Sequence, residues 1–134
     1  MNDKADDLPS RGKPVHWLGS SKRDLSKFPR DVRWEIGGAL WQAQLGGKAP
    51  GAKPLKGFGG SGVLEIVSDF DGDTFRAVYT VRFARAVYVL HVFQKKSRRG
   101  IATPRSDLDL IRRRLRQAGE DYEKWSRSGK NGSK

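Results

Sequence analysis

Cysteine is absent from this sequence of 134 residues. The absence excludes disulfide bonds, thiolate metal sites and cysteine nucleophiles. Long apolar runs are lacking too, because no stretch approaches the roughly 20 apolar residues that span a bilayer. Residues 1–13 carry Asp3, Lys4, Asp6 and Asp7 without an apolar segment, which excludes a signal peptide. We therefore expect a soluble protein of the cytoplasm that does not associate with membranes.

Acidic residues are missing between Asp73 and Asp107. The whole chain has a net charge of +12, from 27 Lys and Arg against 15 Asp and Glu. The stretch without acids concentrates this excess, since its charged residues are Arg76, Arg82, Arg85, Lys95, Lys96, Arg98, Arg99 and Arg105. Such a block indicates an anionic partner, with nucleic acid the first candidate. The alternatives are a generic basic surface and a face that docks an acidic protein.

The length fits one domain, and the patterning predicts an α+β chain. We expect a disordered leader over residues 1–13, a single domain over 14–125 and a disordered tail over 126–134. Helices are predicted at 22–27, at 29–45 and from about 103–106 to 125, and strands at 15–18, 63–68, 74–83 and 86–96. Residues 46–62 are rich in Gly, Pro and Lys and are predicted to be a long loop.

Both longer helices show an apolar stripe at helical spacing. Val32, Ile36, Ala39 and Ala43 form the first stripe, and the second is Leu108, Ile111, Leu115, Ala118, Tyr122 and Trp125. The pair Gly37–Gly38 inside the first helix costs about 1 kcal/mol per residue relative to alanine. Close packing of another element against these glycines would explain them.

The hairpin turns assign faces to the strands. Asp71-Gly72 is a strong type I′ turn signal, and Ala84-Arg85 leaves room for a second two-residue turn. Since opposed residues share a face, one face is a predicted core of Leu64, Ile66, Phe75, Ala77, Tyr79, Val81, Phe83, Tyr88, Leu90 and Val92. The opposite face collects Glu65, Val67, Arg76, Val78, Thr80, Arg82, Val87, Val89, His91, Phe93 and Lys95. It mixes charged and apolar groups, as a half-covered site does.

Two motifs resemble cofactor or metal sites. Residues 57–62 match G-x-G-x-x-G, but a helix and a loop precede them and a strand follows, which is the wrong context for a dinucleotide. Asp69, Asp71 and Asp73 resemble a calcium loop, yet the twelfth position holds Thr80 instead of glutamate. A flexible hinge and an Asp-Gly turn explain the two motifs, so we predict neither a cofactor nor a metal.

The polar face holds the groups that metal-free RNA cleavage needs. That reaction requires a base for the 2′-hydroxyl, cations on the phosphate and an acid for the leaving oxygen. We predict Arg76, His91, Lys95 and Glu65 as catalytic residues. His91 is equally explained as a structural histidine, and Glu65 as an ion-pair partner of Arg76. The expected RNA-binding residues, Phe93 by stacking and the others by charge, are Lys53, Lys56, Arg82, Phe93, Lys96, Arg98 and Arg99.

Several segments together resemble the RelE/ParE toxin superfamily. They are Pro-Leu-Lys-Gly at 54–57, a strand, and then Arg-Ala-Val-Tyr at 76–79. The continuation Leu-His-Val-Phe-Gln-Lys-Lys at 90–96, with Thr-Pro at 103–104, is similar to the phage-derived, HigB-like branch. The similarity covers about residues 13 to 125. In this match Arg76 corresponds to the phosphate-contacting arginine, and His91, Lys95 and Lys96 lie in a strand whose end supplies further catalytic residues.

The resemblance implies a RelE-like fold, with N-terminal helices packed on a small twisted antiparallel sheet and a C-terminal helix. It implies a type II toxin that cleaves mRNA, often on the ribosome, and a helix-turn-helix antitoxin from the same operon. Lys53 stands where one branch has a glutamate base, and Glu65 is on the strand where RelE has lysines, so the base stays open. ParE-like members share the fold without cutting RNA, and a non-enzymatic toxin or binding module is therefore the alternative.

Overall fold

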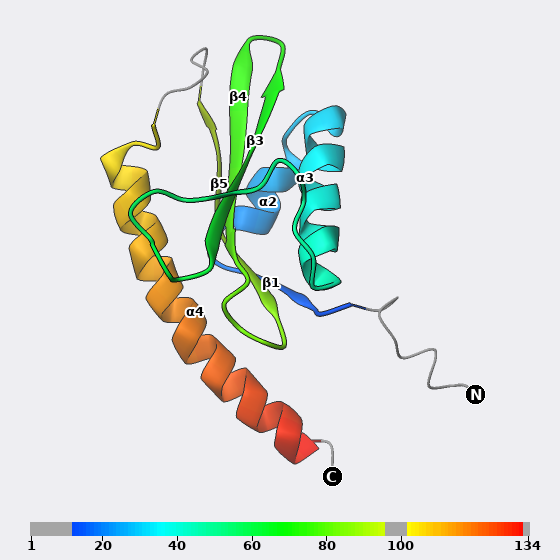
Figure 1. Cartoon of the computed structure of the whole chain (residues 1–134), viewed down its shortest axis with the longest axis vertical. Coiled ribbons are helices and arrows are strands. Elements are labelled where there is room, and N and C mark those ends of the chain that lie inside the picture. The colour runs from blue at the N-terminus through cyan, green and yellow to red at the C-terminus, as the bar shows by residue number, and fades with distance from the viewer. Residues whose placement is uncertain (1–11, 96–101, 133–134) are drawn as a thin grey trace, which may run out of the picture.

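The computed structural model describes residues 12–95 and 102–132 (Figure 1). Its sheet has five strands in the order β1-β5-β4-β3-β2, with β1 parallel to β5 and the other pairs antiparallel. In chain order the elements are β1 (Val15–Trp17), α2 (Ser21–Ser26), α3 (Arg30–Gln44), β2 (Lys53–Pro54), β3 (Val63–Phe70), β4 (Asp73–Thr80), β5 (Val87–Lys95) and α4 (Arg105–Gly132). This arrangement confirms the α+β class and is consistent with a RelE-like fold.

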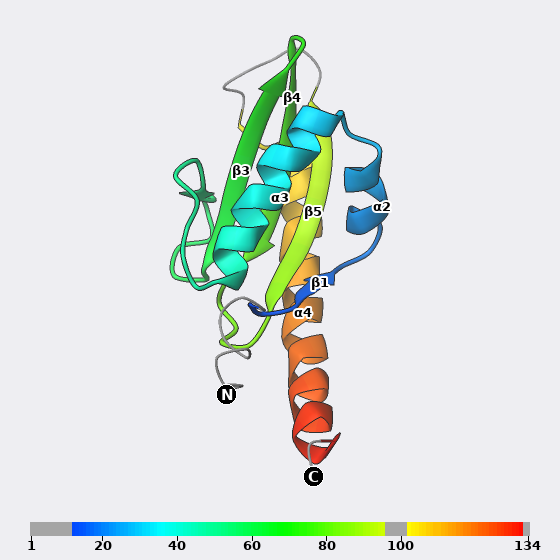
Figure 2. The ribbon, with the colours of Figure 1, turned by 90° about the vertical axis from the view of Figure 1, so that its right-hand side faces the viewer.

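Helices cover both faces of the sheet. Figure 2 shows α3 in front of the strands and α4 behind them, with α2 beside β5. The predicted stripe of α3 is buried, as are Ile111 and Ala118 of the α4 stripe. Pro29 directly precedes α3, where its fixed φ and missing N–H cost no helical hydrogen bond. Helix α4 continues past the expected end at Trp125 to Gly132.

Parts of two predictions fall outside the described residues. They are most of the predicted leader and the basic residues Lys96, Arg98 and Arg99. The domain limits 14–125 stay a prediction. Among the helices that are described, none combines the length and the apolar character needed to cross a membrane.

The hairpin between β3 and β4 has the predicted register. Leu64 pairs with Tyr79, Ile66 with Ala77 and Phe70 with Asp73. Asp71 and Gly72 have φ values of 52° and 85°, which is the sign that a type I′ turn requires at both central positions. The Asp-Gly turn therefore accounts for the local acids.

The register between β4 and β5 was predicted correctly at one end only. Ala77 pairs with Val92 and Val78 with His91, but Tyr79 pairs with Val89 instead of Leu90. Leu90 is the extra residue of a β-bulge, which turns Leu90 and His91 to the same side of the sheet. The residues of β5 that precede His91 therefore face the opposite side of the sheet from the side predicted for them. Phe83, Tyr88 and Leu90 are therefore packed in the core under α4, on the face opposite to the one predicted, and Val87 and Val89 lie in the core under α3 and not on the polar face.

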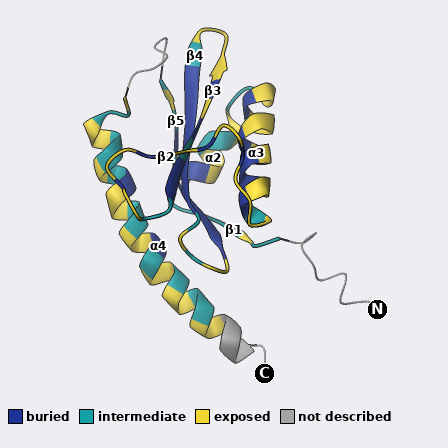
Figure 3. Cartoon of the chain, viewed as in Figure 1, coloured by how far each residue is buried: buried dark blue, intermediate teal, exposed yellow. Residues whose placement is uncertain are grey.

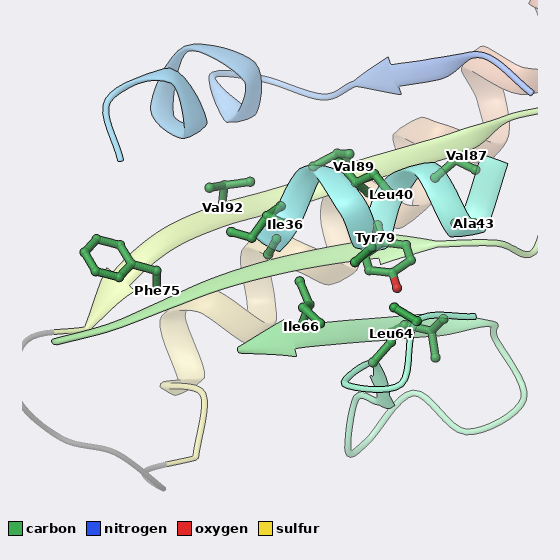
Figure 4. Close-up of a cluster of buried hydrophobic side chains, with 14 of the residues drawn as sticks. Ile36, Leu40, Ala43, Leu64, Ile66, Phe75, Tyr79, Val87, Val89 and Val92 are labelled. Carbon is green, nitrogen blue, oxygen red and sulfur yellow. The ribbon is translucent and has the colours of Figure 1, made fainter. Parts of the chain in front are cut away.

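The molecule has two apolar cores, one on each side of the sheet. The first core lies between the sheet and α3, where Figure 4 shows Ile36 and Leu40 against strand residues that include Tyr79 and Val89. The second core lies under α4 and contains Leu55, Phe58, Val63, Val78, Ala86, Tyr88, Leu90, Ile111 and Ala118. The predicted half-covered face is thus covered by α4 along part of its length.

The connection between α3 and β3 passes from one core to the other. Ala49 and Ala52 belong to the first core, and Leu55 and Phe58 belong to the second. In Figure 1 this segment crosses the sheet from α3 to α4. Its short strand β2 pairs with β3 at that edge, with Lys53 opposite Glu65. The segment predicted as a loop therefore carries two lysines to the polar side of β3.

Candidate active site

A pocket of about 410 Å³ opens between β2, the loop after it, β3, β4 and the start of α4. It brings together four of the predicted site residues, Lys53, Lys56, Glu65 and Arg76. The rest of its lining is Pro54, Leu55, Gly57, Ala102, Thr103, Leu108 and Arg112. Four cationic side chains and one carboxylate thus share one concave site, which suits an anionic ligand.

Glu65 and Arg76 form an ion pair inside this pocket. Nη1 of Arg76 donates a hydrogen bond to Oε2 of Glu65 at 3.1 Å. The two side chains are only 14% and 5% exposed, respectively, so both charges are largely removed from water. Since a pair of this kind holds both groups in one geometry, removing one partner would leave a poorly solvated charge. The pair is a fixed element of the pocket.

Thr103 connects this ion pair to the start of α4. Its hydroxyl donates to Oε2 of Glu65 at 3.0 Å and accepts from Nη1 of Arg76 at 3.3 Å. Thr103 precedes Pro104, and the carbonyl of Pro104 accepts a bond from the Leu108 amide in the first turn of α4. The entry of α4 therefore orients the carboxylate and the guanidinium.

Three further cations surround the pair. Lys53 and Lys56 are exposed, and Lys53 is the direct neighbour of Glu65 across β2 and β3. The Arg112 guanidinium lies 4.9 Å from the Phe58 ring centroid and 3.5 Å from the Asp109 carboxylate. These three side chains add positive charge around the buried pair, where a phosphate could contact them.

His91 lies in the predicted row with Glu65 and Val78 but has a different environment. Its Nε2 lies 2.7 Å from Oδ1 of Asp107 in the first turn of α4. The ring stacks on Phe93 with centroids 4.7 Å apart, and Nδ1 is buried with no hydrogen-bond partner among the described residues. His91 and Phe93 do not line the pocket. Their contacts are those of residues that dock α4 on the sheet.

The other described candidates lie elsewhere on the sheet. Lys95, at the end of β5, pairs with Thr74. Arg82 is exposed beyond the opposite end of β4, where its guanidinium lies 5.8 Å from the Phe83 ring. Neither lines the pocket of Glu65 and Arg76.

Thr103 and Arg112 were not among the predicted site residues. In the sequence, Thr103 stands out only as part of the Thr-Pro pair at 103–104, and Arg112 is one of several arginines on the last predicted helix. The sequence did contain one signal for Arg112, because it follows Leu108 by one helical turn and therefore shares its side of α4. Nothing local indicates that a loop from the opposite side of the sheet meets that turn.

The described residues contain no group of three or more His, Cys, Asp or Glu that could hold a metal ion. The dominant chemistry of the pocket is cationic, with Glu65 as its single carboxylate. This donor set suits a phosphate oxygen and is poorly suited to a divalent cation.

Comparison with known protein families identifies a relationship for most of the chain. A family model described as phage-derived protein Gp49-like matches residues 23–116. No curated protein matches the chain, and no solved structure does. The matched range contains all of the strands except β1, and it includes every residue that lines the pocket. Because it also takes in more than half of the chain, the protein belongs to the phage-derived Gp49-like family, in the RelE-like toxin group.

Proposed function

We propose that the protein is the toxin of a type II toxin–antitoxin system, of the HigB-like kind, and cleaves messenger RNA without a metal ion. The observation that carries the proposal is the buried Glu65–Arg76 pair in a pocket rimmed by Lys53, Lys56 and Arg112. Membership of the Gp49-like family supports the toxin role. It also supports an antitoxin as partner, and translated mRNA on the ribosome is the proposed substrate.

The groups in the pocket suit an internal transesterification of RNA. Glu65 takes the proton of the 2′-hydroxyl, and the 2′-oxygen then forms a bond to the adjacent phosphorus. Arg76 stabilises the charge that develops on the phosphoryl oxygens. The bond from phosphorus to the 5′-oxygen breaks, and that oxygen takes a proton from a lysine ammonium of the rim. The products are a 2′,3′-cyclic phosphate and a 5′-hydroxyl end.

The other predicted catalytic residues have supporting roles in this proposal. His91 holds the first turn of α4 through Asp107, which keeps Thr103 beside Glu65. Lys95 is proposed to contact RNA at the end of β5, together with Lys96, Arg98 and Arg99. Arg82, at the opposite end of the sheet, contacts a more distant part of the substrate.

The products of cleavage test the proposal. The protein is expressed briefly, and the new message ends are mapped and assayed for a 5′-hydroxyl. We expect cuts with 5′-hydroxyl ends in translated messages, and fewer cuts in a message whose start codon has been removed. Ends that carry a 5′-phosphate would contradict the chemistry.

The alternative is a ParE-like toxin that blocks its target without cutting RNA. One observation favours it, because Arg76 already has Glu65 as its partner and a static ion pair needs no substrate. Intact messages together with DNA damage and filamentation would establish this alternative in place of the ribonuclease.

A further inference from the structure

Helix α3 carries an apolar surface on the side opposite the first core. Trp34 is 71% exposed, and Trp41 and Leu45 are each 41% exposed. Trp41 follows Trp34 by one heptad and Leu45 follows one turn later, so the three side chains lie in one line along the helix. The buried stripe of the same helix is displaced from this line by about half a turn. Figure 3 shows the exposed side of α3 facing away from the sheet.

Gly37 and Gly38 lie between the two tryptophans on this exposed side. A Cβ built on either glycine meets no atom within 4 Å, so the packing expected from the sequence is absent among the described residues. Neither glycine has the positive φ that would require glycine. The two glycines therefore lower the helix propensity of α3 without a packing role among the described residues. Because they have no side chains, they leave a notch between the two indoles, where the backbone of another helix can approach α3 closely.

The charge distribution of the chain indicates the sign of a partner. Arg30 and Arg33 border Trp34 in a shallow pocket of about 290 Å³. The other flank carries two acids, Asp31 and Glu35, and the Glu35 carboxylate is turned toward β3, where it accepts a hydrogen bond from Ser68 at 2.6 Å. A second copy would bring another +12 charges to the surface, whereas an acidic partner would be attracted to it.

We infer that the stripe of Trp34, Gly37, Gly38, Trp41 and Leu45 docks an amphipathic helix of an acidic protein. The apolar face of that helix fills the notch, and its carboxylates face Arg30 and Arg33. This inference rests on the proposed function for the identity of the partner, which is the antitoxin. The pocket of Glu65 and Arg76 belongs to a different surface, on the polar side of β3 beside α4.

Titration of the purified chain with the antitoxin from the same operon tests the inference. Gly37→Ala combined with Gly38→Ala fills the notch, and we expect at least a tenfold weaker affinity. The melting temperature of the unbound chain should rise by roughly 5–10 °C, since alanine is the better helix former. Trp41→Ala should weaken binding about 30-fold, as loss of a central tryptophan does in other interfaces. Gly119→Ala, at an equally open glycine of α4, is the matched control and should bind normally.

The two failures can be told apart. Unchanged affinity in the Gly37→Ala, Gly38→Ala and Trp41→Ala proteins would overturn the docking site, even if the wild type arrests growth. No binding of the antitoxin to the wild type would also overturn it. The docking site would likewise be overturned if the purified wild type were a dimer and Trp41→Ala made it monomeric, because the stripe would then bind a second copy of the chain. A wild type that binds the antitoxin through the stripe but leaves growth and messages unaffected would refute the proposed function alone.

Discussion

At the scale of single residues, Thr103 is the side chain that links the start of α4 to the Glu65–Arg76 ion pair. It contacts both Glu65 and Arg76 through one hydroxyl. Thr103→Val keeps the shape and removes both bonds, so we expect message cleavage to slow by roughly tenfold to hundredfold through loss of orientation. Stability should fall by only about 1 kcal/mol. Thr103→Ser keeps the hydroxyl and should restore cleavage. Equal rates in the valine and serine proteins would remove Thr103 from the site.

Variants of Tyr79 distinguish the contribution of its buried ring to stability from that of its hydroxyl. Its side chain is fully buried in the first core, and its hydroxyl has no hydrogen-bond partner among the described residues. Tyr79→Phe should therefore leave the free energy of unfolding unchanged or raise it by about 1 kcal/mol, since a buried hydroxyl without a partner carries a desolvation cost. Tyr79→Ala should lower it by roughly 3–5 kcal/mol. Urea unfolding measures both, and a large loss in the phenylalanine variant would reveal a partner for the hydroxyl.

The same tyrosine predicts a pH dependence. Burial raises the pKa of Tyr79 from 10.0 to about 12, so the folded state holds this proton more tightly than the unfolded state does. The free energy of unfolding therefore includes a contribution from the protonated Tyr79 that is fully present below pH 10 and is lost as the pH rises toward 12. Tyr79→Phe has no hydroxyl to titrate, so the difference in free energy of unfolding between this variant and the wild type should grow by about 1 kcal/mol in favour of the variant from pH 8 to about pH 11. Parallel stability curves for the two proteins would contradict this assignment.

At the scale of elements, the bulge in β5 decides which side chains face α4. Arg114 of α4 donates a hydrogen bond to the carbonyl oxygen of the bulged Leu90 at 2.9 Å. Arg114 is half-buried at this position, and burial lowers the pKa of its guanidinium. A Cβ on Gly19 would collide with the same guanidinium, and Gly19 has a φ of 56°. Three segments thus meet at one arginine.

Replacing Arg114 tests this junction. Arg114→Met keeps much of the aliphatic stem and removes the donor, and we expect unfolding to become easier by about 1.5–3 kcal/mol. Arg113→Met, at an exposed neighbour on the same helix, should change stability by less than about 0.5 kcal/mol. Thermal or urea unfolding of the two variants provides the comparison. Equal losses would mean that the bond to Leu90 does not stabilise the bulge.

The elements and the β3–β4 register were predictable because their signals are local. Helical spacing fixed the buried side of α3, and Asp71-Gly72 fixed the hairpin. The bulge at Leu90 was not predictable, because residues 87–90 are all apolar and all buried, so the sequence shows no alternation that a slip of one residue would disturb. The β3–β4 register already placed Glu65 and Arg76 on one face as diagonal neighbours, which made their ion pair predictable. The positions of Thr103 and Arg112 in the pocket depend on how α4 crosses the sheet, which the sequence does not indicate.

At the scale of the whole molecule, basic charge meets the pocket because one loop crosses between the two cores. Lys53 and Lys56 come from that loop and Arg112 from α4. A ligand phosphate held by lysines releases counterions, so the affinity for RNA should fall steeply with salt. We expect Lys53→Gln combined with Lys56→Gln to flatten the slope of log affinity against log salt by about 1.4 for single-stranded RNA.

Lys48→Gln is the control for this charge effect. Lys48 is exposed in the same loop but does not line the pocket, and its loss should change the slope by much less. Filter binding at several salt concentrations gives the slopes. If Lys48→Gln flattened the slope by half as much as the double variant does, each lysine would contribute equally. RNA would then be attracted by the net charge of the chain and not by a phosphate site in the pocket.

The most direct test of the account is the cleavage rate of Glu65→Gln. The change keeps the shape and an oxygen acceptor for Arg76 and Thr103, but it removes the carboxylate that we propose takes the 2′-proton. The account predicts a protein that is less stable, because Arg76 loses the charge of its partner Glu65, but that still folds, binds RNA and cleaves it about 10²–10⁴-fold more slowly, as loss of a general base does. Near-normal cleavage by a well-folded Glu65→Gln protein would contradict it, and would reduce the Glu65–Arg76 pair to a structural ion pair.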